Sequence, residues 1–223
     1  MTNGRFSWII GVFIVLYSVP LKAQTKAITE RGDSVVLLEG GTWYTAEEYR
    51  QLLRAEYTSL DTSAIAYQKP EVATKQEVGE GGSYRAWYDG EQWESIDANL
   101  LNPQAELAFQ YKGSSEEAYG MTVYEAWEIP TAQLQKIAVQ QANKMGSNLK
   151  VLEEEYRVVN GVTVLYTQLE ATVSGLDLVY HYYFASQEGL SLQYIVFTGK
   201  SYAEKVESRI MDLLNGLVVG SKK

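Results

Sequence analysis

The chain has 223 residues, and its 28 acidic side chains outnumber its 19 basic ones to give a formal net charge of −9. It contains no cysteine, which excludes disulfides, thiol nucleophiles and thiolate metal sites. A net negative field repels nucleic acid and anionic membrane surfaces, so neither is expected as a partner.

The first 23 residues have the layout of a secretory signal peptide. Arg5 precedes an apolar run over residues 8–19, and Ala23-Gln24 offers a cleavage bond. Because a membrane-spanning helix needs about 20 apolar residues, this shorter run predicts cleavage after Ala23 rather than an anchor. We therefore expect an exported protein, periplasmic or extracellular, with no stable membrane insertion after cleavage.

Residues 24–60 predict a small unit made of a hairpin and a helix. Two short runs of β-type residues lie on either side of Gly40-Gly41. Thr45 and Glu48 then form a capping-box pattern, which predicts a helix over residues 46–57.

Residues 61–83 predict a linker, because Ser, Thr, Lys, Glu and Gly replace the periodic apolar pattern and Pro70 interrupts it. The larger domain is expected over residues 84–219, followed by a short tail at 220–223.

The sequence pattern of the larger domain predicts an antiparallel meander with two helices. Asn160-Gly161 and Ser174-Gly175 supply residues that accept a positive φ, as tight hairpin turns require. Strands are predicted at 84–88, 105–111, 118–127, 149–159, 162–173, 176–185 and 190–198. One helix is expected between Pro130 and Gly146, and a second, with a capping box of Ser201 and Glu204, ends at Asn215-Gly216.

Several segments resemble exported proteins with the PsbP-like or Mog1-like fold. These are Tyr84–Tyr88 with Asp89 and Trp93, the Tyr156–Val162 hairpin, Tyr180–Tyr183 and Leu213–Val219. Over residues 84–219 the resemblance implies an α+β fold, an antiparallel sheet of about six to seven strands with one helix on each face. Members of that fold class include a photosystem assembly subunit, a regulator of a small GTPase and bacterial envelope proteins, and most are binding modules. The Gly40–Trp43 hairpin and the Ala23-Gln24 junction are similar to those of exported Bacteroidetes proteins.

No catalytic or metal-binding motif stands out, and no cofactor is expected. His181 is the single histidine. It lies mid-strand, where we expect a structural role with a hydrogen bond to Gln193. Within Glu153-Glu154-Glu155, alternate residues of a strand point to opposite faces, so Glu153 and Glu155 share a side. We expect these charges to be solubilising rather than catalytic.

Aromatic residues are in excess, with 17 tyrosines and 5 tryptophans. Tryptophan is enriched in contact surfaces, although it also fills β cores. Core packing is therefore the first interpretation of these aromatic residues. The alternative, suggested by the places of Trp43, Trp87 and Trp93 near hairpin turns, is a binding patch for an envelope protein or glycan.

These observations favour a non-enzymatic exported binding or assembly module of the bacterial cell envelope, with an unidentified ligand. The alternative is a carboxylate-dependent hydrolase that acts on envelope carbohydrate. Two carboxylates facing each other across an aromatic-lined groove would favour the hydrolase. A structural envelope protein with no small ligand is a third hypothesis.

Overall fold

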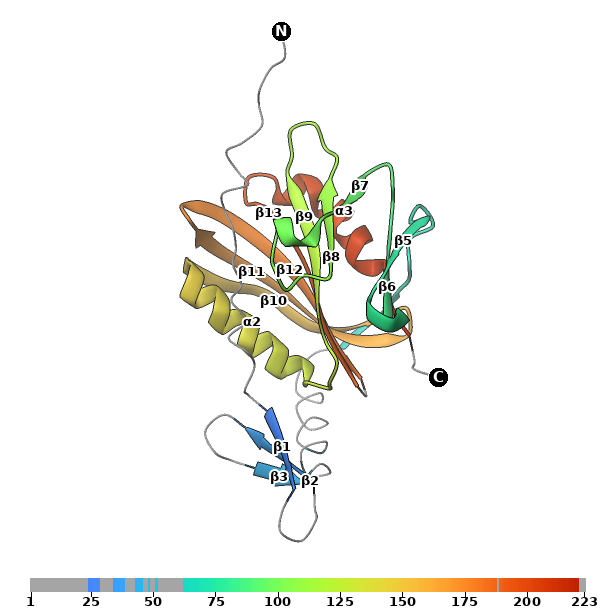
Figure 1. Ribbon diagram of the computed structural model, residues 1–223. Coiled ribbons are helices and arrows are strands. Elements are labelled where there is room, and N and C mark those ends of the chain that lie inside the picture. Colours follow the sequence, from blue (N-terminus) through green and yellow to red (C-terminus); the bar gives the residue numbers. More distant parts are fainter. Residues whose placement is uncertain are drawn as a thin grey trace. The chain divides into compact units, whose positions relative to one another are not determined.

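The computed structural model describes residues 24–28, 34–38, 43–45, 48, 51, 62–187 and 189–220 (Figure 1). The chain divides into two compact units, one within residues 17–61 and one that continues from Thr62 to the C-terminus. The predicted signal peptide and the last three residues of the predicted tail lie outside the described residues.

The N-terminal unit contains a three-stranded antiparallel sheet in the order β1-β2-β3. Its strands are β1 (Gln24–Ile28), β2 (Ser34–Leu38) and β3 (Trp43–Thr45). The β2–β3 pair confirms the predicted hairpin, in which Leu37 pairs with Trp43. Strand β1 was not predicted.

The predicted capping box after β3 is confirmed. The Thr45 N–H donates to Glu48 Oε2 at 2.9 Å, and the Glu48 N–H donates to Thr45 Oγ1 at 3.2 Å. This reciprocal pair satisfies two donors that a helix start leaves unpaired. Glu48 and Gln51 are helical, and the rest of the predicted helix lies outside the described residues.

The second unit is built on a mixed sheet of eight strands, rather than the expected antiparallel sheet of six or seven. Its order is β4-β10-β11-β12-β13-β9-β8-β7. The strands are β4 (Thr62–Tyr67), β7 (Trp93–Ile96), β8 (Leu107–Tyr111), β9 (Ala118–Glu125), β10 (Ser147–Val159), β11 (Val162–Val173), β12 (Leu176–Gln187) and β13 (Leu190–Gly199). Neighbouring strands are antiparallel except β4 and β10, which are parallel.

A second sheet of three strands has the order β14-β6-β5. It contains β5 (Lys75–Val78), β6 (Tyr84–Tyr88) and β14 (Leu217–Val219). Short 3-10 turns, η1 (Glu80–Gly82) and η2 (Ala98–Leu100), follow β5 and β7 respectively. The segment 84–88, expected in the main sheet, therefore belongs to this small sheet.

The prediction that residues 61–83 form a linker is wrong, because this segment supplies both β4 and β5. Strand β4 continues the main sheet beside β10, and its Tyr67 carbonyl accepts a hydrogen bond of 2.9 Å from the Asn160 N–H. These strands are short and carry little apolar periodicity. Strand β4 pairs with β10, which is distant in the sequence, whereas β5 pairs with β6, the next strand along the chain, so strand pairing rather than a local apolar pattern determines them. The unit begins at Thr62.

Two helices cover the main sheet on opposite faces, as predicted (Figure 1). Helix α2 (Thr131–Met145) packs on β10, β11 and β12, whereas α3 (Ala203–Asn215) packs on β9, β12 and β13 and on β6 of the small sheet. The predicted capping box at the start of α3 is wrong: the N-cap is Tyr202, and no side chain caps the helix.

The two predicted hairpin turns are confirmed. Both residues of each turn have positive φ, 48° and 83° at Asn160-Gly161 and 52° and 80° at Ser174-Gly175. The side chain of Asn160 also donates to the carbonyls of Asn215 (2.8 Å) and Leu217 (2.7 Å). This turn therefore ties β10–β11 to the junction of α3 and β14.

We expect residues 62–220 to fold as an isolated fragment, because they contain every strand of both sheets in the second unit. A fragment of residues 84–219 should be markedly less stable, since it lacks β4 and β5 and leaves β10 and β6 each with one unpaired edge. Circular-dichroism melts of both fragments test this. Equal melting temperatures would show that β4 and β5 contribute nothing to stability.

Candidate functional site

Trp87 and Trp93, two of the three predicted binding tryptophans, do not form one patch. Trp93 is 2% exposed and packs edge-on against Tyr111 with ring centroids 5.3 Å apart, so it belongs to the core and the binding prediction is wrong for it. The side chain of Trp43 lies outside the described residues. Trp87 is half-buried in β6, on a different sheet from Trp93.

Strand alternation explains why Trp87 faces outward. Tyr84, Ala86 and Tyr88 are buried, whereas Arg85 and Trp87 between them are half-buried. Successive side chains of a strand point to opposite faces. The alternation Tyr-Arg-Ala-Trp-Tyr therefore places an arginine and a tryptophan together on the outward face of the small sheet.

Strand register supplies the neighbours of these two side chains. Arg85 pairs with Val78 of β5 on one side and with Val218 of β14 on the other, and Trp87 pairs with Gln76. We call the outward side chains of this sheet the Trp87 face: Gln76, Val78, Arg85, Trp87 and Val218. Val78 is 48% exposed, so an apolar group of this face is open to solvent.

The only charge among the five side chains of the Trp87 face is the Arg85 guanidinium, which has no hydrogen-bonding or ionic partner in the described part of the chain. A second cation lies close by, since Lys69 Nζ is 5.0 Å from the centroid of a Trp87 ring. Lys69 Nζ also donates to the Ala73 carbonyl at 2.9 Å. Cation–π contacts of this kind stabilise by about 0.5–1 kcal/mol when exposed.

A close backbone contact holds Trp87 in place. The Trp87 N–H donates to the Gly216 carbonyl at 2.9 Å. A Cβ at position 216 would lie 1.8 Å from the Trp87 carbonyl oxygen, so only glycine fits where α3 ends. Asn215-Gly216 signals a helix end in the sequence, but nothing local to it indicates this contact with β6.

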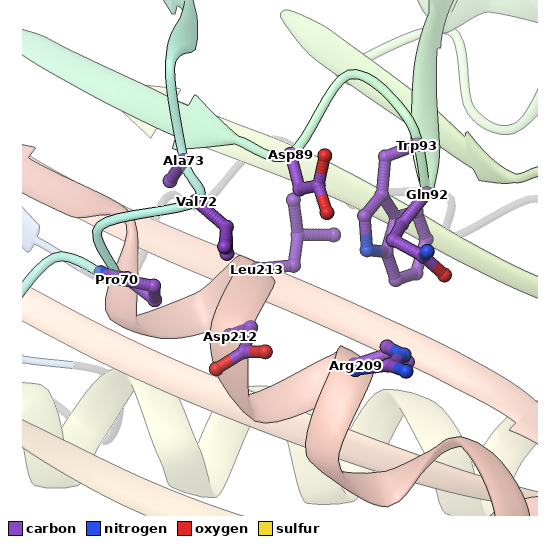
Figure 2. A pocket seen from close by; sticks show the side chains of 9 residues that line it. All are labelled: Pro70, Val72, Ala73, Asp89, Gln92, Trp93, Arg209, Asp212 and Leu213. Carbon is purple, nitrogen blue, oxygen red and sulfur yellow. The ribbon is translucent and has the colours of Figure 1, made fainter.

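A pocket on the same unit brings two carboxylates together. Figure 2 shows Asp89 of the β6–β7 turn beside Trp93, with Arg209 and Asp212 of α3 below them. Burial raises the pKa of Asp212; Arg209 lowers it and Asp89 raises it again, and the net direction is upward. This is the type of arrangement that the hydrolase hypothesis requires.

The size of this pocket argues against a saccharide substrate. Its cavity volume is about 10 Å³, roughly the space of one water molecule. Ligand pockets usually enclose about 300–1,000 Å³. Since Trp93 is buried in the wall, it offers no open ring face on which a sugar could stack.

His181 belongs to a buried polar cluster. Its Nδ1 lies 2.9 Å from the Tyr166 hydroxyl, and its Nε2 has no hydrogen-bonding partner in the described ranges. Burial, and then the charge of Arg157, lower the pKa of His181 to about 4. The expected bond to Gln193 is wrong, because Val196 pairs with His181 and Gln193 lies on the opposite face.

Arg157 explains the arrangement of the glutamate run. Its guanidinium lies 3.5 Å from the centroid of the Tyr166 ring and forms ion pairs with Glu153 and Glu155. Glu154 points the other way and accepts a hydrogen bond of 2.8 Å from Gln135 of α2. The predicted alternation is confirmed, but two of these charges stabilise a buried arginine rather than serving solubility alone.

The sequence analysis did not predict Arg85 or the exposed Trp127 as candidate binding residues. The signal for Arg85 was available, since it lies two residues before Trp87 on the same predicted strand face. Trp127 is 46% exposed in the connection between β9 and α2, where no periodic pattern indicates its orientation.

The described residues include no group of three or more His, Cys, Asp or Glu side chains suited to a metal ion. None of the helices in those same residues is long and apolar enough to cross a membrane.

Comparison with protein-family models gives no match, and comparison with curated proteins gives none either. The chain is similar to the solution structure of cyanobacterial PsbP (CyanoP) from Synechocystis, with 12% identity, a TM-score of 0.48, and coverage of 68% of this chain and 95% of that one.

Two crystal structures are similar at the same level. LpqN, involved in cell envelope biogenesis of Mycobacterium tuberculosis, has 7% identity and a TM-score of 0.48, with coverage of 66% of this chain and 90% of that one. The Ran-binding protein Mog1p of Saccharomyces cerevisiae has 10% identity and a TM-score of 0.44, with 65% and 94% covered. Identities this low transfer no residue roles to this chain.

Proposed function

We propose that this protein is a non-enzymatic binding or assembly module, exported to the bacterial cell envelope, and that it contacts its partner through the Trp87 face. The signal-peptide pattern of the first 23 residues supports export. The observation that carries the binding role is a half-buried tryptophan beside an arginine that has no partner among the described residues, both held on a sheet.

Tryptophan and arginine are the residues that most often dominate binding energy at protein interfaces. The Gly216 contact holds the backbone of Trp87 in a single position, so little conformational entropy is lost when a partner binds. A buried arginine normally has an ionic or hydrogen-bonding partner, as Arg157 has. Arg85, half-buried and with no such partner in the ranges that the structure describes, is therefore a candidate for pairing with an external group.

We expect Trp87→Ala to weaken partner capture at least tenfold. The full-length exported protein, immobilised, would be incubated with envelope extract, and retained components quantified by mass spectrometry. Trp127→Ala is the matched control, because it removes an exposed tryptophan that belongs to the β9–α2 connection and not to the small sheet. Thermal melts confirm that both variants fold. Equal retention by wild type and Trp87→Ala would exclude the Trp87 face as the binding surface.

The hydrolase remains a second candidate because Asp89 and Asp212 face one pocket. It requires that the pocket open beyond its present volume to admit a saccharide. Release of reducing ends from purified peptidoglycan, lost in both Asp89→Asn and Asp212→Asn, would support it. No release by the wild-type protein would exclude it for this substrate.

A further inference from the structure

We infer that the partner bound by the Trp87 face is an acidic polypeptide segment in an extended conformation. This inference rests on the proposed function and specifies the chemistry of its ligand. Three features of the small sheet carry it: the charge of the face, the apolar groups beside that charge, and the open edge of β5.

The charge of the Trp87 face is opposite to that of the chain. The protein has 28 acidic and 19 basic side chains, yet the five outward side chains of the small sheet include Arg85 and no carboxylate. Lys69 adds a second cation over the Trp87 ring. A carboxylate on a partner can accept two parallel hydrogen bonds from the Arg85 guanidinium, which matches its geometry.

Apolar surface lies directly beside this charge. Val78 and Val218 flank the stem of Arg85 on the two neighbouring strands. With the Trp87 ring they form a surface that suits aliphatic or aromatic side chains. A ligand that alternates carboxylates with such side chains fits this face better than a uniformly charged polymer.

The edge of the small sheet favours a polypeptide over a glycan. Strand β5 ends the order β14-β6-β5, and no strand pairs with its outer edge in the described part of the chain. An open edge presents backbone N–H and C=O groups that an extended segment can pair with. A peptide lying there would place every second side chain on the same side as the Trp87 face, beside Gln76 and Val78 of β5, with Arg85 and Trp87 on the next strand.

The test uses a random copolymer of glutamate and tyrosine as the probe, fluorescently labelled, with binding to the exported full-length protein followed by anisotropy. We expect saturable binding despite the net negative charge of the protein. Arg85→Gln and Trp87→Ala should each weaken it at least tenfold. Lys150→Gln is the control, because it removes an exposed cation of β10, and it should change affinity less than twofold.

Two outcomes would overturn the inference: no binding of the copolymer, or equal weakening by Arg85→Gln and Lys150→Gln, which would indicate general attraction to any cation. A parallel titration with neutral chito-oligosaccharides separates this inference from the proposed function. If these sugars bind, and Trp87→Ala abolishes their binding while Arg85→Gln does not, the Trp87 face is a binding site but its ligand is not an acidic segment.

Discussion

Leu213→Ala should lower the free energy of unfolding by about 2 to 5 kcal/mol, the range for truncation of a buried leucine. Leu213 is 1% exposed and lies on the buried side of α3. A Cβ added at Gly120 of β9 would lie 2.9 Å from Leu213 Cδ2. The leucine therefore occupies space that the glycine leaves open on the sheet, and the neighbouring strands cannot easily close the cavity left by alanine.

Urea denaturation of the wild type and the variant measures this loss. Ser208→Ala is the matched control, because Ser208 lies on the exposed side of the same helix and substitutions at such sites usually change stability by less than about 0.5 kcal/mol. An unchanged midpoint for Leu213→Ala would mean that α3 does not pack on the sheet through this residue.

Because of His181, the free energy of unfolding should decrease as the pH falls from about 6.5 to about 4. Its folded-state pKa is lowered to about 4 from the usual 6.5. Above pH 6.5 the imidazole is neutral in both states and contributes no pH dependence. Below pH 6.5 the imidazole of the unfolded chain binds a proton that the imidazole of the folded chain does not. The free energy of unfolding therefore falls by at most roughly 3 kcal/mol, and this decline levels off below pH 4.

The difference between wild type and His181→Gln isolates this contribution. Tyr166 contacts the imidazole and the charge of Arg157 acts on it, and both residues remain in the variant together with the ion pairs of Arg157. Unfolding free energies at pH 7.5, 6, 5 and 4 should decline less steeply for His181→Gln. Parallel curves would show that His181 is solvated and not buried in a neutral form.

The sequence predicted the elements that depend on local signals. Turn residues with positive φ located the β10–β11 and β11–β12 hairpins, and Asn215-Gly216 located the end of α3. The site was predicted only in part. Trp87 remains the candidate, but Trp93 near the same turn is in the core, because the side of a sheet that becomes buried depends on what packs against it.

Amino-acid order alone determined the alternation that places Arg85 and Trp87 on one strand face, since a period of two is a property of any extended strand. Tertiary structure decided which sheet that strand joins and which side faces solvent. Strand β4 forms because the distant strand β10 supplies its hydrogen bonds, and β6 lies where Gly216 lets α3 approach it. The pairing of β6 with the distant strand β14 is not indicated by the sequence of either segment, so only the folded chain reveals the small sheet and the face it exposes.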